Sequence, residues 1–218
     1  MEKIAEQDLL RYRRYTGEFN LEFPLDVKKV FRCVFGLQTH FVDLTHEAPV
    51  SEVPAHKVLG GLYPEKFFFQ GKDKVILINT GYEALTTEFC RFVIAHVAGH
   101  YVLHFGHEEA YKSMELMKPN FALSRPTFCN LLDQHRPLEI QASHYASAIL
   151  MPRGEIFRLS TSQKLLDLYG QTHVLCQRFG VSQQILELRL QQLEAELRHA
   201  GHTYPSYPMP VSTELLKF

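Results

Sequence analysis

The sequence predicts an α+β fold in which one helix precedes a small antiparallel sheet, and a helical half follows. Three observations carry this prediction. Short β-rich runs occur only between residues 39 and 79. Helical spacing of apolar residues dominates the chain from residue 86 onward. Strands and helices are segregated along the chain rather than alternating, which is typical of α+β proteins.

The N-terminal part begins with a polar lead-in, residues 1–20, that is compatible with a helix. Residues 24–36 are predicted to form a helix, because Pro24 can open it and Gly36 can close it. One face of this helix is apolar, with Val27, Val30, Phe31 and Val34 at helical spacing. We expect that face to be buried.

The sheet is predicted from three β-rich runs. Residues 39–44 form a short strand, and residues 62–70 and 73–79 form two longer runs. The turn-forming residues between the last two runs favour a hairpin. The aromatic run at residues 67–69 is expected to contribute to the sheet core, with one ring directed outward.

The helical half begins with the strongest helix of the chain, residues 86–105, which Thr86 or Thr87 can cap. Residues 106–135 show no clear period. Further helices are predicted at residues 136–150, 162–179 and 181–199, with Gly180 at the last turn. The expected divisions of the chain are a lead-in at 1–24, a main domain at 25–160, a C-terminal helical segment at 161–199 and an extended tail at 200–218.

The composition excludes several classes of protein. Lys and Arg number 23 against 24 Asp and Glu, so no basic excess points to a protein that coats nucleic acid. No apolar run approaches the roughly 18 residues of a membrane span, and no secretory signal is evident. The four cysteines form no C-x-x-C pair, which favours reduced thiols. We therefore expect a soluble, cytoplasmic protein.

The segment 96–100, His-Val-Ala-Gly-His, is the main chemical signal. Two histidines at positions i and i+4 of a helix project from the same face, so His96 and His100 could reach one zinc ion at ~2.0–2.1 Å. The alternative is a pair of ordinary surface or core histidines. In zinc peptidases this motif is H-E-x-x-H, and its glutamate acts on the metal-bound water. Val97 stands in its place here.

Longer motifs resemble the ImmA/IrrE family of metallopeptidases. Residues 91–104, RFVIAHVAGHYVLH, are similar to the family's active helix, R-F-T-x-A-H-E-L-G-H-x-L-L-H. Residues 139–152, EIQASHYASAILMP, are similar to its E-x-E-A-N-x-F-A-A-x-L-L-M-P helix. Segments 60–63, 75–79 and 175–190 fit its small sheet and C-terminal pattern, so the resemblance covers roughly residues 25 to 195. It implies a zincin-type helical core.

The resemblance also implies a ligand set. His96 and His100 would be the first two zinc ligands and Glu139 the third, with Gln141 as a poorer alternative. Three protein ligands and a water are the usual arrangement of a catalytic zinc site. Ser143 stands where the family has Asn or Asp, which holds a ligand histidine through its second ring nitrogen.

Val97 is the departure that affects activity most. A valine accepts no proton, and loss of a general base typically removes about 10²–10⁴-fold of rate. His104 is expected to be a structural or second-layer histidine beside the site. Five residues that follow could in principle supply a substitute base: His107, Glu108, Glu109, Asp133 and His135.

These considerations leave three functional hypotheses. The leading one is an ImmA/IrrE-like zinc-peptidase domain with impaired catalysis, which binds a protein partner such as a transcriptional repressor. The second is an active metal-dependent hydrolase that uses a substitute base. The third is a metal-free interaction or regulatory module. The C-terminal pair, residues 174–197, has the spacing of a helix-turn-helix, but its arginines and glutamates balance, so contact with DNA is not expected.

Overall fold

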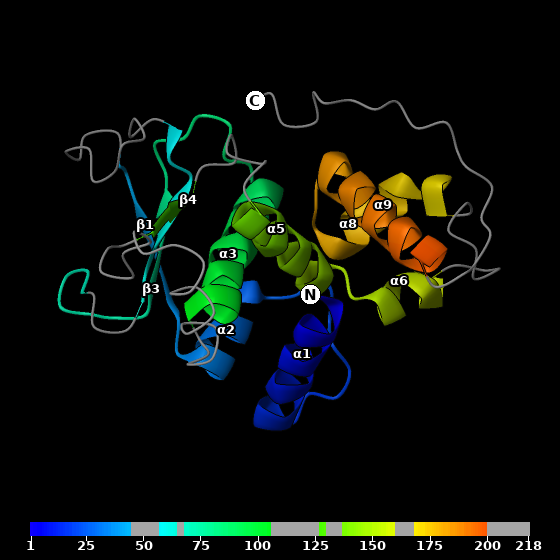
Figure 1. Cartoon of the computed structure of the whole chain (residues 1–218), viewed down its shortest axis with the longest axis horizontal. Coiled ribbons are helices and arrows are strands. Elements are labelled where there is room, and N and C mark those ends of the chain that lie inside the picture. Colours follow the sequence, from blue (N-terminus) through cyan, green and yellow to red (C-terminus); the bar gives the residue numbers. More distant parts are fainter. Residues whose placement is uncertain (45–56, 65–67, 106–126, 130–136, 160–167, 200–218) are drawn as a thin grey trace.

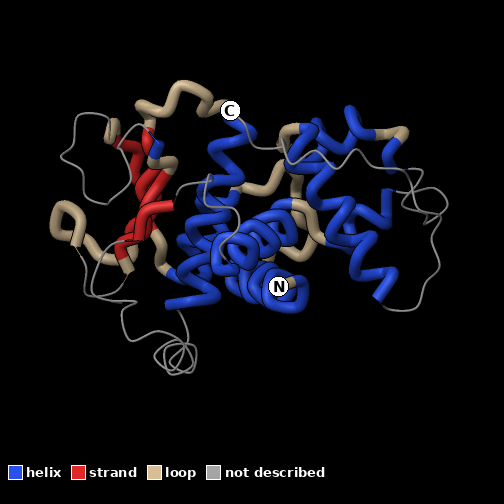
Figure 2. Tube along the Cα trace, turned by 45° about the horizontal axis from the view of Figure 1, so that its top comes forward, coloured by secondary structure: helices blue, strands red, loops and turns tan. Residues whose placement is uncertain are grey.

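The computed structural model describes residues 1–44, 57–64, 68–105, 127–129, 137–159 and 168–199. The predicted α+β class is confirmed. The strands gather at one side of the molecule, and the helices occupy the centre and the other side (Figures 1 and 2). No helix in the described ranges is long and apolar enough to cross a membrane.

The sheet has four strands, in the order β1-β3-β2-β4. They are β1 (Gln38–Val42), β2 (Gly60–Tyr63), β3 (Val75–Asn79) and β4 (Thr127–Cys129). The prediction of an antiparallel sheet is wrong for one pair, since β1 and β3 are parallel. Every residue of β3 is buried, so this strand takes an interior position with a neighbour on each side. The central strand β3 therefore runs parallel to β1 on one side and antiparallel to β2 on the other.

The predicted antiparallel pairing of the second and third β-rich runs is confirmed, with Gly60 opposite Ile78 and Tyr63 opposite Val75. The first of these strands is shorter and begins earlier than expected. An isolated bridge between Phe69 and Lys72 closes the turn. Phe68 is 64% exposed and is the outward ring, whereas residues 65–67 lie outside the described part of the chain.

Two helices precede the sheet. The lead-in forms α1 (Glu2–Thr16), which packs on the later helix α5 (Pro137–Leu150). The Tyr145 hydroxyl donates a hydrogen bond to Asp8 at 2.9 Å across that contact. Helix α2 (Val27–Phe35) begins after Pro24 rather than at it, because the Asp26 side chain caps it by accepting from the Lys29 N–H at 3.1 Å. It ends at Gly36 with φ 72°, as predicted.

The strongest predicted helix is α3 (Thr87–His100), and the Thr86 hydroxyl caps it by accepting from the Phe89 N–H at 3.2 Å. Its last turn widens into a π-helical segment, η2 (Tyr101–Phe105), which the sequence did not indicate. Helix α3 packs on β2 and β3 with one side and on α5 with another. It therefore lies between the sheet and α5 (Figure 1).

The C-terminal part contains α6 (Arg153–Leu159), which was not predicted, and the pair α8 (Thr172–Phe179) and α9 (Gln183–His199). Gly180 adopts φ 60° at the turn between α8 and α9. The apolar residues of the pair are core residues, as expected: Phe179, Val181, Leu186, Leu190 and Leu193 are all buried. The proposed tail at 200–218 and the start of the helix at 162 lie outside the described residues.

Candidate metal centre

The two histidines of the central motif lie side by side on α3. Their ring centroids are 4.9 Å apart, and their Nε2 atoms are 3.2 Å apart. Both side chains are almost fully buried, at 1% and 3% exposure. The i, i+4 spacing of His96 and His100 therefore directs two imidazole nitrogens to one point, as the sequence predicts.

The third donor comes from the first turn of α5. Glu139 Oε2 lies 2.9 Å from His96 Nε2 and 3.3 Å from His100 Nε2. Gln141, the alternative ligand, is two residues further along and so points from a different face of the helix. The expected trio is thus brought together, although its members are separated by up to 43 positions in the chain.

These three donor atoms match the requirements of a small divalent ion. Two ligand atoms at ~2.0–2.1 Å from a tetrahedral zinc ion are about 3.3 Å apart. The observed separations are 2.9, 3.2 and 3.3 Å, close to that value. His96, His100 and Glu139 form a group that could hold a metal ion.

The close approach of α3 and α5 that creates this group depends on Gly99. A Cβ atom at this position would lie 3.1 Å from the Ala142 carbonyl oxygen and 3.1 Å from Tyr145 Cδ1. These contacts are shorter than ordinary van der Waals contact, so a larger side chain would require the two helices to shift by a few tenths of an ångström. Glycine between the two histidines therefore permits the close approach that brings Glu139 to both of them.

The electrostatics of Glu139 favour its ionised form. Burial raises the pKa of the carboxyl, but hydrogen bonds from His100 and then His96 outweigh that effect, and the pKa lies well below its usual 4.5. A carboxylate that stays ionised is a suitable partner for a cation. The site therefore offers two imidazole nitrogens, which bind a metal in their neutral form, and one negatively charged carboxylate oxygen.

Ser143 lies one turn beyond Glu139 on α5 and reaches the first histidine. Its Oγ is 3.2 Å from His96 Nδ1, the ring nitrogen that faces away from Glu139. A contact of this kind fixes the ring orientation and directs the other nitrogen toward a metal. Although serine is shorter than the asparagine of the ImmA/IrrE pattern, it occupies the expected position.

His104 lies on η2 beside the site, with its ring centroid 5.5 Å from that of His100. Burial, followed by the charge of His100, lowers the pKa of His104 to about 4, against an opposing hydrogen bond to the Leu138 backbone. Its Nε2 is buried and has no hydrogen-bond partner among the described residues. It is a neutral neighbour of the donor group rather than one of the three donors within 4.8 Å.

Position 97 faces the sheet. The Val97 side chain is fully buried, and its Cγ2 lies 3.2 Å from where a Cβ of Gly60 would be. A Cβ at Gly60 would also lie 2.6 Å from the Leu77 carbonyl oxygen, so strand β2 requires glycine here. No sequence pattern predicts this contact, since it joins residues that only the tertiary fold brings together.

The five candidate substitute bases, residues 107, 108, 109, 133 and 135, lie outside the described part of the chain. The described thiols of Cys33, Cys90 and Cys176 are free. Of the arginines in the C-terminal helical pair, Arg189 is 1% exposed and donates to the Met151 carbonyl at 3.0 Å and to Glu2 at 2.7 Å. That arginine stabilises the core and is not available to a phosphate.

Comparisons with known proteins give little further information. No family model and no curated protein matches the sequence. One solved structure with some likeness is a Mycobacterium tuberculosis transcriptional regulator, with 17% identity, a TM-score of 0.45 and coverage of 84% of this chain and 49% of the other. The present chain thus spans about half the length of that protein. At this level of similarity the match shows neither a family nor a function for this chain.

Proposed function

We propose that this chain is a zinc-binding protein of the ImmA/IrrE metallopeptidase type whose peptidase activity is impaired and which binds a protein partner. The observation that carries the proposal is the convergence of His96, His100 and Glu139 within 4.8 Å. The motifs around residues 91–104 and 139–152 support the same conclusion, because they resemble the two helices that form the site in that family.

Zinc is the metal that this donor set fits best. Two imidazole nitrogens and one carboxylate oxygen form a typical catalytic zinc set with a fourth position left for water or substrate. When bound, zinc would polarise a water or a carbonyl group as a Lewis acid. The protein would hold it with His96, His100 and Glu139, and Ser143 would fix the orientation of the His96 ring.

Impaired catalysis follows from position 97. The buried Val97 packs toward β2 and provides no group that can take a proton. With the general base missing, we expect peptide hydrolysis to be slowed by about 10²–10⁴-fold relative to an intact site. A fold that retains the metal but not the base is suited to recognition rather than to cleavage, and by resemblance the partner would be a repressor.

Metal content tests the first part of the proposal. Native mass spectrometry of the tag-free protein should show about one zinc per chain, and the variants His96→Ala and Glu139→Gln should lose it. His173→Ala on the exposed face of α8 is the matched control and should keep it. Absence of zinc from the wild-type protein after reconstitution would overturn the proposal in favour of a metal-free module.

The second part is tested by restoring the base. Val97→Glu should gain zinc-dependent cleavage of quenched fluorescent casein, whereas Val97→Gln, of equal size, should not. Chelator-sensitive cleavage by the wild-type protein at a rate similar to that of Val97→Glu would contradict impaired catalysis. It would favour an active hydrolase with a substitute base.

A further inference from the structure

Of the described strands, β1 and β4 are the two outer ones, and the outer edge of β1 is open as far as the described residues extend. Within the described part of the chain, β1 pairs with β3 alone. The Gln38 N–H donates to the Lys74 carbonyl at 2.8 Å, and the Val42 carbonyl accepts from the Thr80 N–H at 2.9 Å. Since backbone groups alternate along a strand, the N–H and C=O groups of Thr39 and Phe41 face the open edge.

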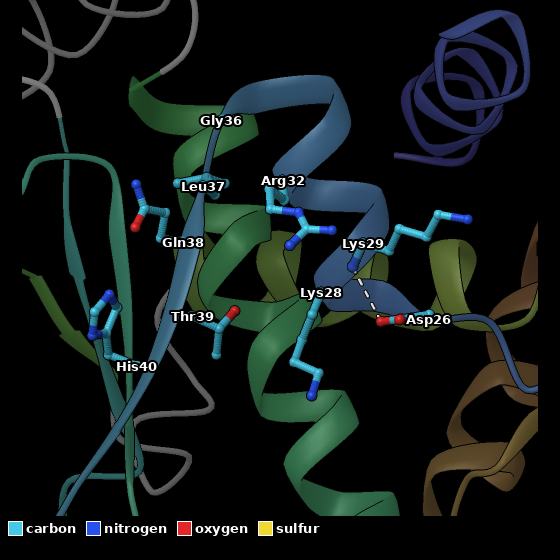
Figure 3. Close-up of a pocket in the computed structure, with 9 residues that line it drawn as sticks. All are labelled: Asp26, Lys28, Lys29, Arg32, Gly36, Leu37, Gln38, Thr39 and His40. Carbon is cyan, nitrogen blue, oxygen red and sulfur yellow. Dashed lines mark hydrogen bonds between the residues drawn. The ribbon is translucent and has the colours of Figure 1, made fainter. Parts of the chain in front are cut away.

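A groove runs along this edge, between β1 and α2. It has a cavity volume of about 650 Å³ and is open to solvent. Lys28 and Arg32 project from α2 on the side of β1, and Thr39 is directed toward them from the strand (Figure 3). Gln38 and His40 lie on the other side of the strand (Figure 3). The open edge is therefore flanked by a cationic helix face.

The charge of the groove is positive, although the chain as a whole has a formal net charge of −1. Arg32 is exposed and has no ionic partner among the described residues. The Lys28 ammonium lies 5.7 Å from the centre of the Phe41 ring, directly over the open strand. Asp26, the one carboxylate of the lining, caps the Lys29 N–H at 3.1 Å and keeps its negative charge, and the Lys29 ammonium is paired with Glu18 at 2.7 Å. Lys28 and Arg32 together still leave a positive excess for a ligand in this groove.

We propose that the open edge of β1 binds an extended, acidic segment of a protein partner by strand addition. The backbone of the segment would pair with Thr39 and Phe41, and its carboxylates at alternate positions would face Lys28 and Arg32. Strand addition supplies affinity through main-chain hydrogen bonds and specificity through alternate side chains. A nucleic acid has no backbone that matches the unpaired amides of a strand, and two cations neutralise few phosphates.

This surface is separate from the metal centre. The metal ligands lie on α3 and α5, and position 97 adjoins β2, whereas β1 is at the opposite side of β3. The inference therefore does not depend on metal binding. Zinc content, measured in the same variants, distinguishes failure of this proposal from failure of the proposed function.

The probe is a fluorescein-labelled, capped ten-residue peptide of alternating Thr and Glu, titrated with the full chain by fluorescence anisotropy at low salt. We expect saturable binding and shifts of the Thr39 and Phe41 amide resonances. Lys28→Glu/Arg32→Glu should weaken binding by about tenfold or more, because two attractive contacts become repulsive. Lys3→Glu/Arg14→Glu, an equal charge change on exposed positions of α1, should leave it unchanged.

A backbone variant provides an independent check. Thr39→Pro removes an outward N–H without breaking the β1–β3 ladder, and proline is tolerated on a strand edge of this kind. It should abolish binding while zinc content stays at the wild-type level. The proposal is overturned if no saturable binding occurs, if a Thr-Gln peptide binds as tightly, if the Lys28/Arg32 variant binds normally, or if a short DNA duplex competes for the same residues more strongly than the peptide.

Discussion

Replacing Gly99 with alanine should damage both the fold and the metal centre. The added Cβ would lie 3.1 Å from two groups of α5, the Ala142 carbonyl oxygen and the Tyr145 ring, and 3.3 Å from the Ala142 Cα. Ordinary van der Waals contact begins at 3.4 Å, so the helices must separate by about 0.3 Å. Tyr145 cannot move freely, because it is fully buried and its hydroxyl is bonded to Asp8.

The size of the effect follows from two opposing contributions. Overpacking of a rigid contact costs about 1–3 kcal/mol. Alanine is better than glycine inside a helix by about 1 kcal/mol, which offsets part of the cost. We therefore expect Gly99→Ala to lower the free energy of unfolding by about 1 kcal/mol, with 0–2 kcal/mol as the range. Zinc affinity should fall about tenfold or more, as disturbing the groups that support a ligand does.

Urea unfolding of the metal-free protein measures the first quantity, and competition with a chromogenic zinc chelator measures the second. Gly154→Ala on α6 is the matched control, since no atom lies within 4 Å of its added Cβ. The control should be neutral or stabilising by up to about 1 kcal/mol, with unchanged zinc affinity. If Gly99→Ala behaves like Gly154→Ala in both assays, the close approach of α3 and α5 does not set the geometry of the site.

Three further predictions concern the same region. Glu139→Gln should weaken zinc binding by at least about a hundredfold in the chelator assay, because a neutral amide replaces the charged ligand; equal affinity would exclude Glu139 as a ligand. Ser143→Ala should weaken zinc binding by about 10–100-fold through loss of the contact to His96. Unchanged zinc affinity would show that packing alone holds the His96 ring. Burial, and then the charges of Arg189 and the N-terminus, lower the pKa of His144. The stability that its neutral form contributes is therefore complete above pH 6.5, and it is lost as the pH falls from there through the pKa of His144 in the folded protein. Urea unfolding of the metal-free protein at pH 7.5 and 5.5 should accordingly show a larger acid loss in the wild type than in His144→Gln.

The sequence predicts the features of this fold that depend on local chemistry. Thr86 caps the beginning of α3 and Gly36 ends α2, as expected, because helix caps and left-handed glycines are determined by neighbouring residues. The His96–His100 pair is likewise a consequence of helical spacing. Glu139 is different: its distance along the chain gives no spacing rule, and only the resemblance of two longer motifs indicated it.

Features that depend on long-range pairing were missed. The parallel pairing of β1 with β3 is one such feature, because no local pattern specifies which strand becomes a neighbour or in which direction it runs. The three residues of β4 are too few for a periodic signal. The contact of Val97 with Gly60 joins a helix to a strand that lies far from it in sequence.

The position of β4 has a consequence for any peptide that approaches the metal centre. Residues 127–129 pair with Gly60–Leu62, so the edge of the strand beside position 97 is already filled by the chain itself. An incoming strand would compete with one that belongs to the same chain, and linkage to the chain favours the strand already in place. A free peptide would therefore have to pair with β2 more tightly than β4 does in order to displace it. A peptide that reaches the metal centre by replacing β4 is therefore expected to need a second contact elsewhere on the protein that holds it nearby.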